Sequence, residues 1–194
     1  MSKQEVILCE NLEESLGHAL EKCPHDKLFI LTDEHTDRLC LPALKEVPQL
    51  KNAIEIRIGA EDIHKTLDTL ASVWMALSEK GATRHSLLIN LGGGMVTDLG
   101  GFAAATFKRG LAYINIPTTL LAMVDASVGG KTGINFNGLK NEIGAFAPAN
   151  SVLIETEFLR SLDAHNFISG YAEMLKHGLI SDKAHWVELL ALDR

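Results

Sequence analysis

Three consecutive glycines, Gly92–Gly94, separate a strand-like apolar run from a segment that can form a helix. Backbone N–H groups at such a junction can bind a pyrophosphate, and the helix N-terminus favours the negative charge. Asp33 ends an earlier strand-like run, where a carboxylate often accepts a hydrogen bond from a ribose hydroxyl. These residues predict a nucleotide site. The spacing differs from G-x-G-x-x-G, and a tight turn without a ligand is the alternative.

The run 129–132, Gly-Gly-Lys-Thr, is similar to the end of a P-loop. A P-loop also requires glycine at position 125, where this chain has Asp125. The residues before it, 118–124, read as a helix rather than a strand. The sequence therefore disfavours an NTPase.

Three cations, Arg109, Lys131 and Lys140, lie in glycine-rich, loop-like surroundings. Asp125 and Asn141 are close to them in the sequence. Solvated surface charge is the simplest interpretation of any one of these cations. Together they favour a pocket for a substrate that carries phosphate or carboxylate.

Glu173, Lys176 and His177 have helical i, i+3 and i+4 spacing and share one face. Glu173 fits a metal ligand, a base or half of a surface ion pair. The chain has eight histidines but no H-E-x-x-H motif. A catalytic zinc needs three protein ligands, so these residues alone do not predict a complete metal site.

Strands and helices that alternate along the first 90 residues must position these groups. The expected strands are 6–9, 27–32, 53–58, 86–91 and 152–154, and the expected helices are 11–23, 62–80 and 95–108, with helical pattern from 155 to 194. Such alternation predicts a parallel sheet covered by helices on both faces. We expect an α/β domain over residues 1–150 and the start of a helical domain over 151–194.

Composition excludes several classes of protein. The 194 residues are 46% hydrophobic and 22% charged, which is typical of a globular chain. A net charge of −7 disfavours nucleic-acid binding, and no apolar run reaches the ~18 residues of a membrane helix. Residues 1–5 lack the basic start of a secretory signal. Cys9, Cys23 and Cys40 have no paired spacing, so we expect buried free thiols in the cytoplasm.

Four ordered segments resemble 3-dehydroquinate synthases: 92–102, 116–133, 140–146 and 169–176. The resemblance implies a Rossmann-like parallel-sheet NAD domain followed by the start of an all-α metal and substrate domain. It implies a lyase of the shikimate pathway that depends on NAD and on zinc or cobalt. Such an enzyme converts 3-deoxy-arabino-heptulosonate 7-phosphate to 3-dehydroquinate and phosphate by transient oxidation, elimination, reduction and aldol cyclisation.

The resemblance also implies roles for individual residues. The NAD contacts would be Asp33, Asp62, Lys65, Gly93, Gly94, Met95, Val96, Asp98, Thr118, Thr119, Lys131, Lys140, Phe158, Leu159, Arg160 and Ser161. The substrate contacts would be Asp125, Lys131, Lys140, Asn141, Lys176 and Arg109, and catalysis would use Lys131, Lys176, Asn141 and Arg109. Glu173 would be a metal ligand, and Arg109 would reach the phosphate from the neighbouring subunit of a homodimer.

Three departures from the family pattern qualify these expectations, one of which is Ser161-Leu162-Asp163 in place of the usual Thr-Leu-Pro. Asp62 stands where glutamate is usual, which weakens the expected adenosine-side contact. Family members run to roughly twice this length, and two histidine ligands are expected in the remainder, so the chain alone is expected to be inactive. The alternatives are another sugar phosphate cyclase, such as a 2-deoxy-scyllo-inosose synthase, a glycerol-type dehydrogenase or a non-catalytic NAD-binding fragment.

Overall fold

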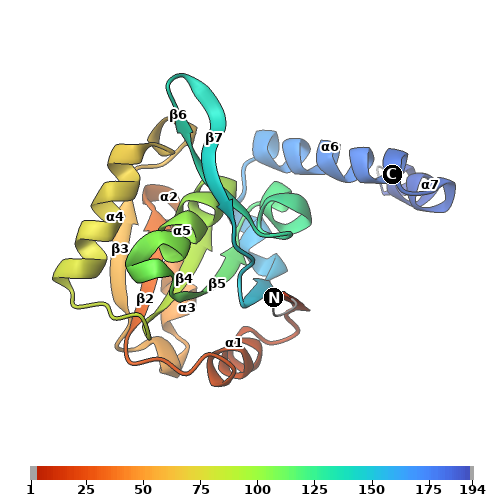
Figure 1. Cartoon of the computed structure of the whole chain (residues 1–194). Coiled ribbons are helices and arrows are strands. Elements are labelled where there is room, and N and C mark those ends of the chain that lie inside the picture. Colours follow the sequence, from red (N-terminus) through yellow and green to blue (C-terminus); the bar gives the residue numbers. More distant parts are fainter. Residues whose placement is uncertain (1–3, 193–194) are drawn as a thin grey trace.

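The computed structural model describes residues 4–192 (Figure 1). Two short segments lie outside the described residues. They are Met1–Lys3, which are part of the argument against a secretory signal, and residues 193–194 of the predicted C-terminal helix. Six parallel strands form one sheet in the order β1-β8-β5-β4-β2-β3. Their bounds are β1 (Glu5–Leu8), β2 (Leu28–Asp33), β3 (Ile54–Ile58), β4 (Leu87–Gly92), β5 (Ala112–Pro117) and β8 (Ser151–Ile154).

Helices cover both faces of this sheet, as predicted. They are α1 (Leu12–Glu21), α2 (Glu34–Leu39), α3 (Leu41–Lys45), α4 (Leu67–Glu79) and α5 (Gly94–Thr106). Leu16 of α1 and Leu44 of α3 are in one buried cluster, whereas Leu70 of α4 and Leu99 of α5 are in the other. Strands β2 and β4 are buried along their whole length, which explains their continuous apolar sequences.

The predicted helix over 62–80 divides into two elements. Asp62–His64 form a single 3-10 turn, η2, and α4 begins only at Leu67. The cause is local, because the side chain of Thr66 accepts a hydrogen bond from the Thr69 amide and caps α4. The break leaves Lys65 outside the helix.

The expected helix over 118–124 also differs, because a π-helical turn, η4, spans Ala122–Ala126.

Residues 131–146, expected to be loop-like, form an antiparallel hairpin of β6 (Lys131–Phe136) and β7 (Leu139–Phe146). Two glycines allow the strands to meet, because a Cβ at Gly144 would lie 2.0 Å from the Thr132 carbonyl oxygen. Ile134 is buried in the same cluster as α4 and α5, which fixes the hairpin to the body. Most of β7 is exposed, and its apolar residues, such as Leu139 and Phe146, face solvent and do not mark a buried face in the sequence.

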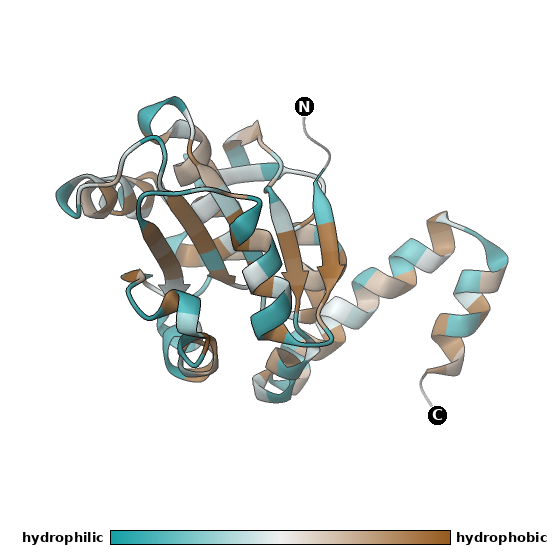
Figure 2. Cartoon of the chain, turned by 90° about the horizontal axis from the view of Figure 1, so that it is seen from below, coloured by the Kyte–Doolittle hydropathy of each residue, from teal (hydrophilic) through white to brown (hydrophobic). Residues whose placement is uncertain are grey.

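Two helices, α6 (Ala164–Ile180) and α7 (Lys183–Ala191), project from the body as an arm that follows the 3-10 turn η5 (Thr156–Ser161) (Figures 1 and 2). At the root of the arm, a Cβ at Gly170 would lie 2.6 Å from the Leu121 nitrogen, so α6 lies directly against η4. Apolar side chains remain exposed along the arm, including Ile180 at 74%.

Strand β8 belongs to the sheet, so we propose that the α/β domain extends past residue 150 to residue 154.

Two smaller expectations concern the cysteines and the membrane. Cys9, Cys23 and Cys40 are free thiols; Cys9 is only partly buried, unlike the other two. Burial raises the pKa of Cys40 to about 11, so this thiol stays protonated at neutral pH. Over residues 4–192, every helix is too short or too polar to cross a bilayer.

The contact between α5 and the sheet at Gly100 leads to the first prediction. A Cβ at Gly100 would lie 2.0 Å from Asn90 Oδ1 and 2.8 Å from Leu31 Cδ2, both in strands under the helix. Gly100→Ala is therefore expected to lower the free energy of unfolding by about 1–3 kcal/mol in urea denaturation. Gly17→Ala in α1 is the matched control, since its Cβ would meet only Gln49 Nε2 at 3.4 Å. The control should gain up to ~1 kcal/mol, and equal stability of the two variants would contradict the close contact.

Candidate functional site

A cleft of about 1360 Å³ lies at the carboxyl ends of the central strands. Ligands of open parallel sheets bind at this edge. Its wall includes Asp33 after β2, Gly93 and Gly94 after β4, and Thr118 after β5. The hairpin contributes Lys131, Lys140, Asn141 and Phe146, and Asn166 and Ser169 come from the root of α6. The fold thus brings together residues from segments more than 130 positions apart.

Helix α5 starts at the cleft without a side-chain cap. Gly93 is its N-cap, and the Thr118 amide donates to the Gly92 carbonyl at 3.0 Å, which holds the loops after β4 and β5 together. The first amides of an α-helix have no intrahelical acceptor, so they suit an anion. Met95 lines the cleft, whereas the Val96 side chain is fully buried in the core. Only the backbone amide of Val96 is therefore suited to the cofactor contact predicted for it.

Asp33 has a structural task in addition to its predicted ribose contact. Its Oδ1 accepts from the amides of His35, at 2.9 Å, and Thr36, at 2.8 Å, and so caps α2. The reciprocal bond from the Asp33 amide to Thr36 Oγ1 completes a capping box. These bonds use one carboxylate oxygen and leave Oδ2 for a ligand hydroxyl. The capping role was not predicted, although threonine three residues after aspartate is its signal.

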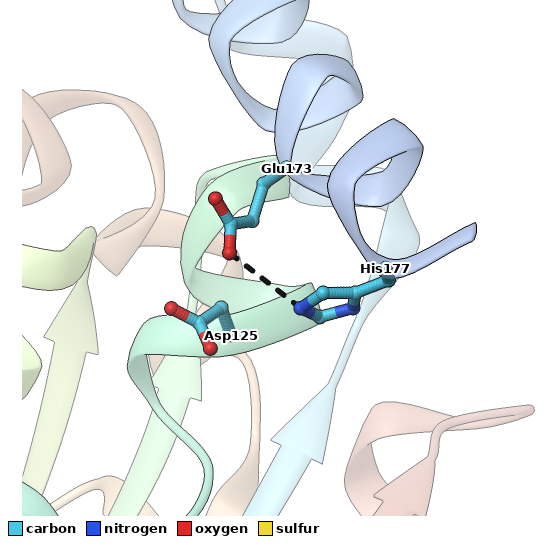
Figure 3. A group of neighbouring side chains, drawn as sticks. All are labelled: Asp125, Glu173 and His177. Atoms are coloured by element: carbon cyan, nitrogen blue, oxygen red, sulfur yellow. Dashed lines mark ion pairs between the residues drawn. The ribbon is translucent and has the colours of Figure 1, made fainter. Parts of the chain in front are cut away.

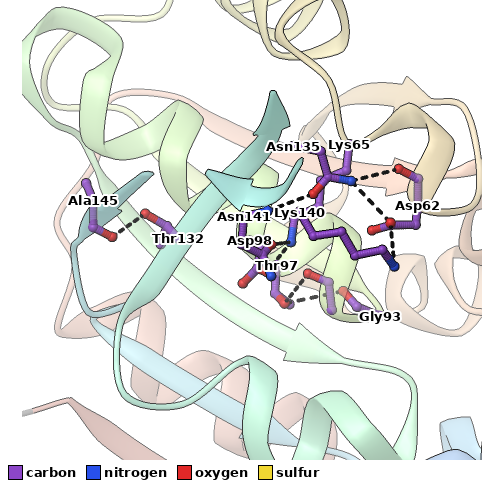
Figure 4. Close-up of polar contacts among 11 residues, drawn as sticks. Asp62, Lys65, Gly93, Thr97, Asp98, Thr132, Asn135, Lys140, Asn141 and Ala145 are labelled. Atoms are coloured by element: carbon purple, nitrogen blue, oxygen red, sulfur yellow. Dashed lines mark hydrogen bonds and ion pairs between the residues drawn. The ribbon is translucent and has the colours of Figure 1, made fainter. Parts of the chain in front are cut away.

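Lys65 is a buried cation at the side of the cleft. Its side chain is 6% exposed and forms an ion pair with Asp98 of α5 at 2.5 Å. The same Nζ donates to Asn141 Oδ1 on the hairpin (Figure 4). Burial raises the pKa of Asp98, although the neighbouring Lys65 opposes that shift. One ammonium group therefore connects the nucleotide-loop helix with the hairpin.

A second, more exposed group lies beside Lys65. Lys140 Nζ pairs with Asp62 Oδ2 at 3.1 Å, and Asn135 Nδ2 donates to the same oxygen at 3.1 Å (Figure 4). Burial acts to raise the pKa of Asp62, but these two hydrogen bonds lower it overall. Asp62 is therefore ionised at neutral pH. The usual glutamate would carry the same charge on a longer side chain.

Asp125, Glu173 and His177 place their donor atoms within 4.8 Å of one another (Figure 3). Asp125 comes from η4, whereas Glu173 and His177 are one turn apart on α6. Glu173 Oε1 also forms an ion pair with Lys176, which raises the pKa of Lys176, and lies 3.5 Å from His177 Nε2. Two carboxylates and an imidazole fit zinc or cobalt. The i, i+4 spacing could have indicated His177, but nothing local indicated that Asp125 would join it.

The remaining predicted site residues differ in whether they line the cleft. Thr119, Asp125 and Ser161 line the cleft with the groups above. Phe158 is buried in the core, and Arg160 pairs with Glu157 at 2.7 Å on the surface. The lining of the cleft also excludes Leu159, Glu173, Lys176 and Arg109. Arg109 follows the far end of α5, about 20 Å from its start at 1.5 Å per residue, so its predicted phosphate contact would require another subunit.

The fold and the cleft define the class: a Rossmann-like α/β domain of the kind found in sugar phosphate cyclases. The 2-epi-5-epi-valiolone synthase of Streptomyces hygroscopicus, solved with NAD⁺ and Zn²⁺, is 31% identical with a TM-score of 0.80, over 91% of this chain and 49% of that chain. A 2-deoxy-scyllo-inosose synthase, solved with carbaglucose-6-phosphate, NAD⁺ and Co²⁺, is 26% identical with a TM-score of 0.83, over 91% and 48%.

A more specific match comes from the sequence. The family model for the 3-dehydroquinate synthase N-terminal region matches residues 55–169. A 3-dehydroquinate synthase of Parabacteroides distasonis is 53% identical over 193 residues, which is all of this chain and 55% of the relative. The chain belongs to the 3-dehydroquinate synthase family. It spans about half the length of the curated relatives that it matches.

Proposed function

We propose that this chain provides the nucleotide-binding and part of the phosphate-binding machinery of a 3-dehydroquinate synthase. The substrate would be 3-deoxy-arabino-heptulosonate 7-phosphate, and the products 3-dehydroquinate and phosphate. One observation carries the proposal: a single cleft combines the uncapped start of α5 with Lys131 and Lys140 of the hairpin. Such a cleft suits a dinucleotide beside an anionic substrate. Membership in the 3-dehydroquinate synthase family supports this particular reaction.

The dinucleotide would be NAD. The amides of the first turn of α5 would bind its pyrophosphate, and Asp33 Oδ2 would accept from a ribose hydroxyl. Glu173 would be one ligand of a zinc or cobalt ion, Asp125 and His177 lie close enough to contribute, and the two histidines that the family resemblance implies would complete the site. When bound, NAD supplies a hydride acceptor and donor, and the metal supplies a Lewis acid. The cofactors present in the two solved cyclases support this proposal.

The substrate would be held by charge and by hydrogen bonds from the hairpin. Lys131 and Lys140 are flexible ammonium groups that can contact phosphate or carboxylate oxygens. Lys176 lies beside Glu173, so it can donate to a substrate oxygen at the metal ligands. Arg109 would contribute from a neighbouring subunit of a cytoplasmic homodimer. All of these roles are part of the proposal.

A second candidate is a different sugar phosphate cyclase. The similarity to the valiolone and inosose synthases, at 31% and 26% identity, favours it over an unrelated enzyme. The two candidates share cofactors and differ in the substrate. A non-catalytic NAD-binding role would leave NAD binding intact without any preference for a sugar phosphate.

Calorimetric titration with NAD, in the presence of zinc, tests the proposal. We expect the chain to bind NAD and Asp33→Asn to bind it about tenfold more weakly, because a hydrogen bond to a charged group is worth about 1.5–3 kcal/mol. Asparagine still caps α2, so the melting temperature should change little. The heptulosonate phosphate should strengthen NAD binding more than glucose 6-phosphate does. Absence of NAD binding by the unaltered chain would refute the proposal.

A further inference from the structure

Asn135 lies behind the cleft wall and contacts three of the predicted ligand residues. Its Oδ1 accepts from the Asn141 amide at 2.9 Å, and its Nδ2 donates to Asp62 Oδ2 at 3.1 Å. Its own backbone amide donates to the Lys65 carbonyl at 2.8 Å. Asn135 is half-buried on β6 and is outside the lining of the cleft (Figure 4). A single residue thus connects the hairpin to the η2 turn.

Of the residues that Asn135 connects, Lys65 is held by its buried ion pair with Asp98, whereas Asn141 and Asp62 depend on weaker contacts. Asn141 has a φ of +54°, a left-handed conformation that asparagine tolerates but that costs some free energy without supporting contacts. The ion pair between Lys140 and Asp62 is largely exposed, with side chains 78% and 48% accessible, and contributes little. The orientation of Asn141 therefore depends on its amide bond to Asn135 and on its side-chain bond to Lys65.

We propose that Asn135 is a positioning residue, which holds Asn141 and the turn carrying Asp62 and Lys65 in the arrangement that binds ligands. The inference rests on the proposed function for the identity of those ligands. A primary amide suits this position because it accepts from one neighbour and donates to the other. Aspartate could still accept from Asn141 but would place a second carboxylate beside Asp62. Alanine would provide neither bond.

The test compares Asn135→Ala and Asn135→Asp with Asn137→Gly. Asn137 is the matched control because it lies on the same hairpin, is exposed and has a φ of +50°, which glycine adopts freely. The readouts are the melting temperature, the NAD dissociation constant and the hydrogen-exchange rate of the Asn141 amide by NMR. Exchange at Asn141 reports the geometry without any ligand.

We expect Asn135→Ala to increase exchange at Asn141 at least tenfold and to weaken NAD binding about tenfold, with little change in melting temperature. Asn135→Asp should keep the Asn141 amide protected but still weaken NAD binding, whereas Asn137→Gly should match the unaltered chain in both. Unchanged exchange at Asn141 in Asn135→Ala would overturn the proposal. So would a lower melting temperature with unchanged NAD affinity, since that marks a purely structural role. If the unaltered chain binds no NAD, the proposed function fails, while the exchange rates still decide the positioning role.

Discussion

Replacing Lys65 with methionine is expected to lower the free energy of unfolding by about 3–5 kcal/mol, because a buried carboxylate then loses its partner. The Lys65 side chain is 6% exposed and Asp98 is 19% exposed, so water replaces the ammonium group only in part. Asn141 Oδ1 loses its donor at the same time. Guanidinium denaturation followed by circular dichroism measures the effect.

Lys140→Met is the matched control for Lys65→Met. It removes the same ammonium group from an ion pair with Asp62 whose side chains are 78% and 48% exposed. Exposed pairs contribute about 0–1 kcal/mol, so the control should remain close to the unaltered chain. Adding Asp98→Leu to Lys65→Met should recover part of the loss by removing the buried charge. Equal effects of the two lysine substitutions would show that burial does not strengthen the pair with Asp98.

The loss of folding stability caused by Lys65→Met should increase as the pH rises. Burial raises the pKa of Asp98 in the folded chain, and without Lys65 the folded pKa is higher still. The unfolded chain then loses this proton before the folded chain does. Folding is therefore favoured below the unfolded pKa, near ~3.9, and this contribution is lost as the pH rises through the folded pKa. The stability gap to the unaltered chain should thus widen from pH 4 to pH 7.

Gly93→Val is expected to weaken NAD binding at least ~100-fold, which corresponds to about 3 kcal/mol. A Cβ at Gly93 would lie 3.0 Å from Thr119 Cγ2, so the valine methyl groups occupy the space between the start of α5 and Thr119. Under the proposed function, the pyrophosphate would bind there. The backbone of Gly93, with φ −74° and ψ −170°, is accessible to valine, so the fold should persist. Calorimetry with NAD and thermal melting measure both.

Ala105→Val is the matched control for Gly93→Val. It introduces the same side chain into α5 at the end away from the cleft, so it tests only the lower helix propensity of valine. We expect NAD affinity to be unchanged in this variant. NAD binding by Gly93→Val within threefold of the unaltered chain would contradict a pyrophosphate site at the start of α5.

The sequence predicted elements that depend on neighbouring residues more accurately than elements that depend on contacts between distant segments. The buried strands β2 and β4 were predicted because continuous apolar runs with short lengths are visible locally. The start of α1 was predicted at residue 11, and Asn11 caps the helix by accepting a hydrogen bond from the Glu14 amide at 3.1 Å. The strand β5 and the hairpin β6–β7 were missed. The hairpin is stabilised by two facing glycines and by Ile134 on the body, and neither produces an alternating apolar pattern.

By itself, the sequence determined the parallel sheet, the glycine loop before α5, the carboxylate at the end of β2 and the family motifs. Each of these depends on a pattern within one element or on the order of the elements along the chain. Only the tertiary structure decided that Lys65 meets Asp98 and Asn141, 33 and 76 positions away, and that Asp125 lies beside Glu173 and His177. Those contacts arise where the hairpin and α6 pack against the body. The spacing of residues within one element does not indicate which other element that element will contact.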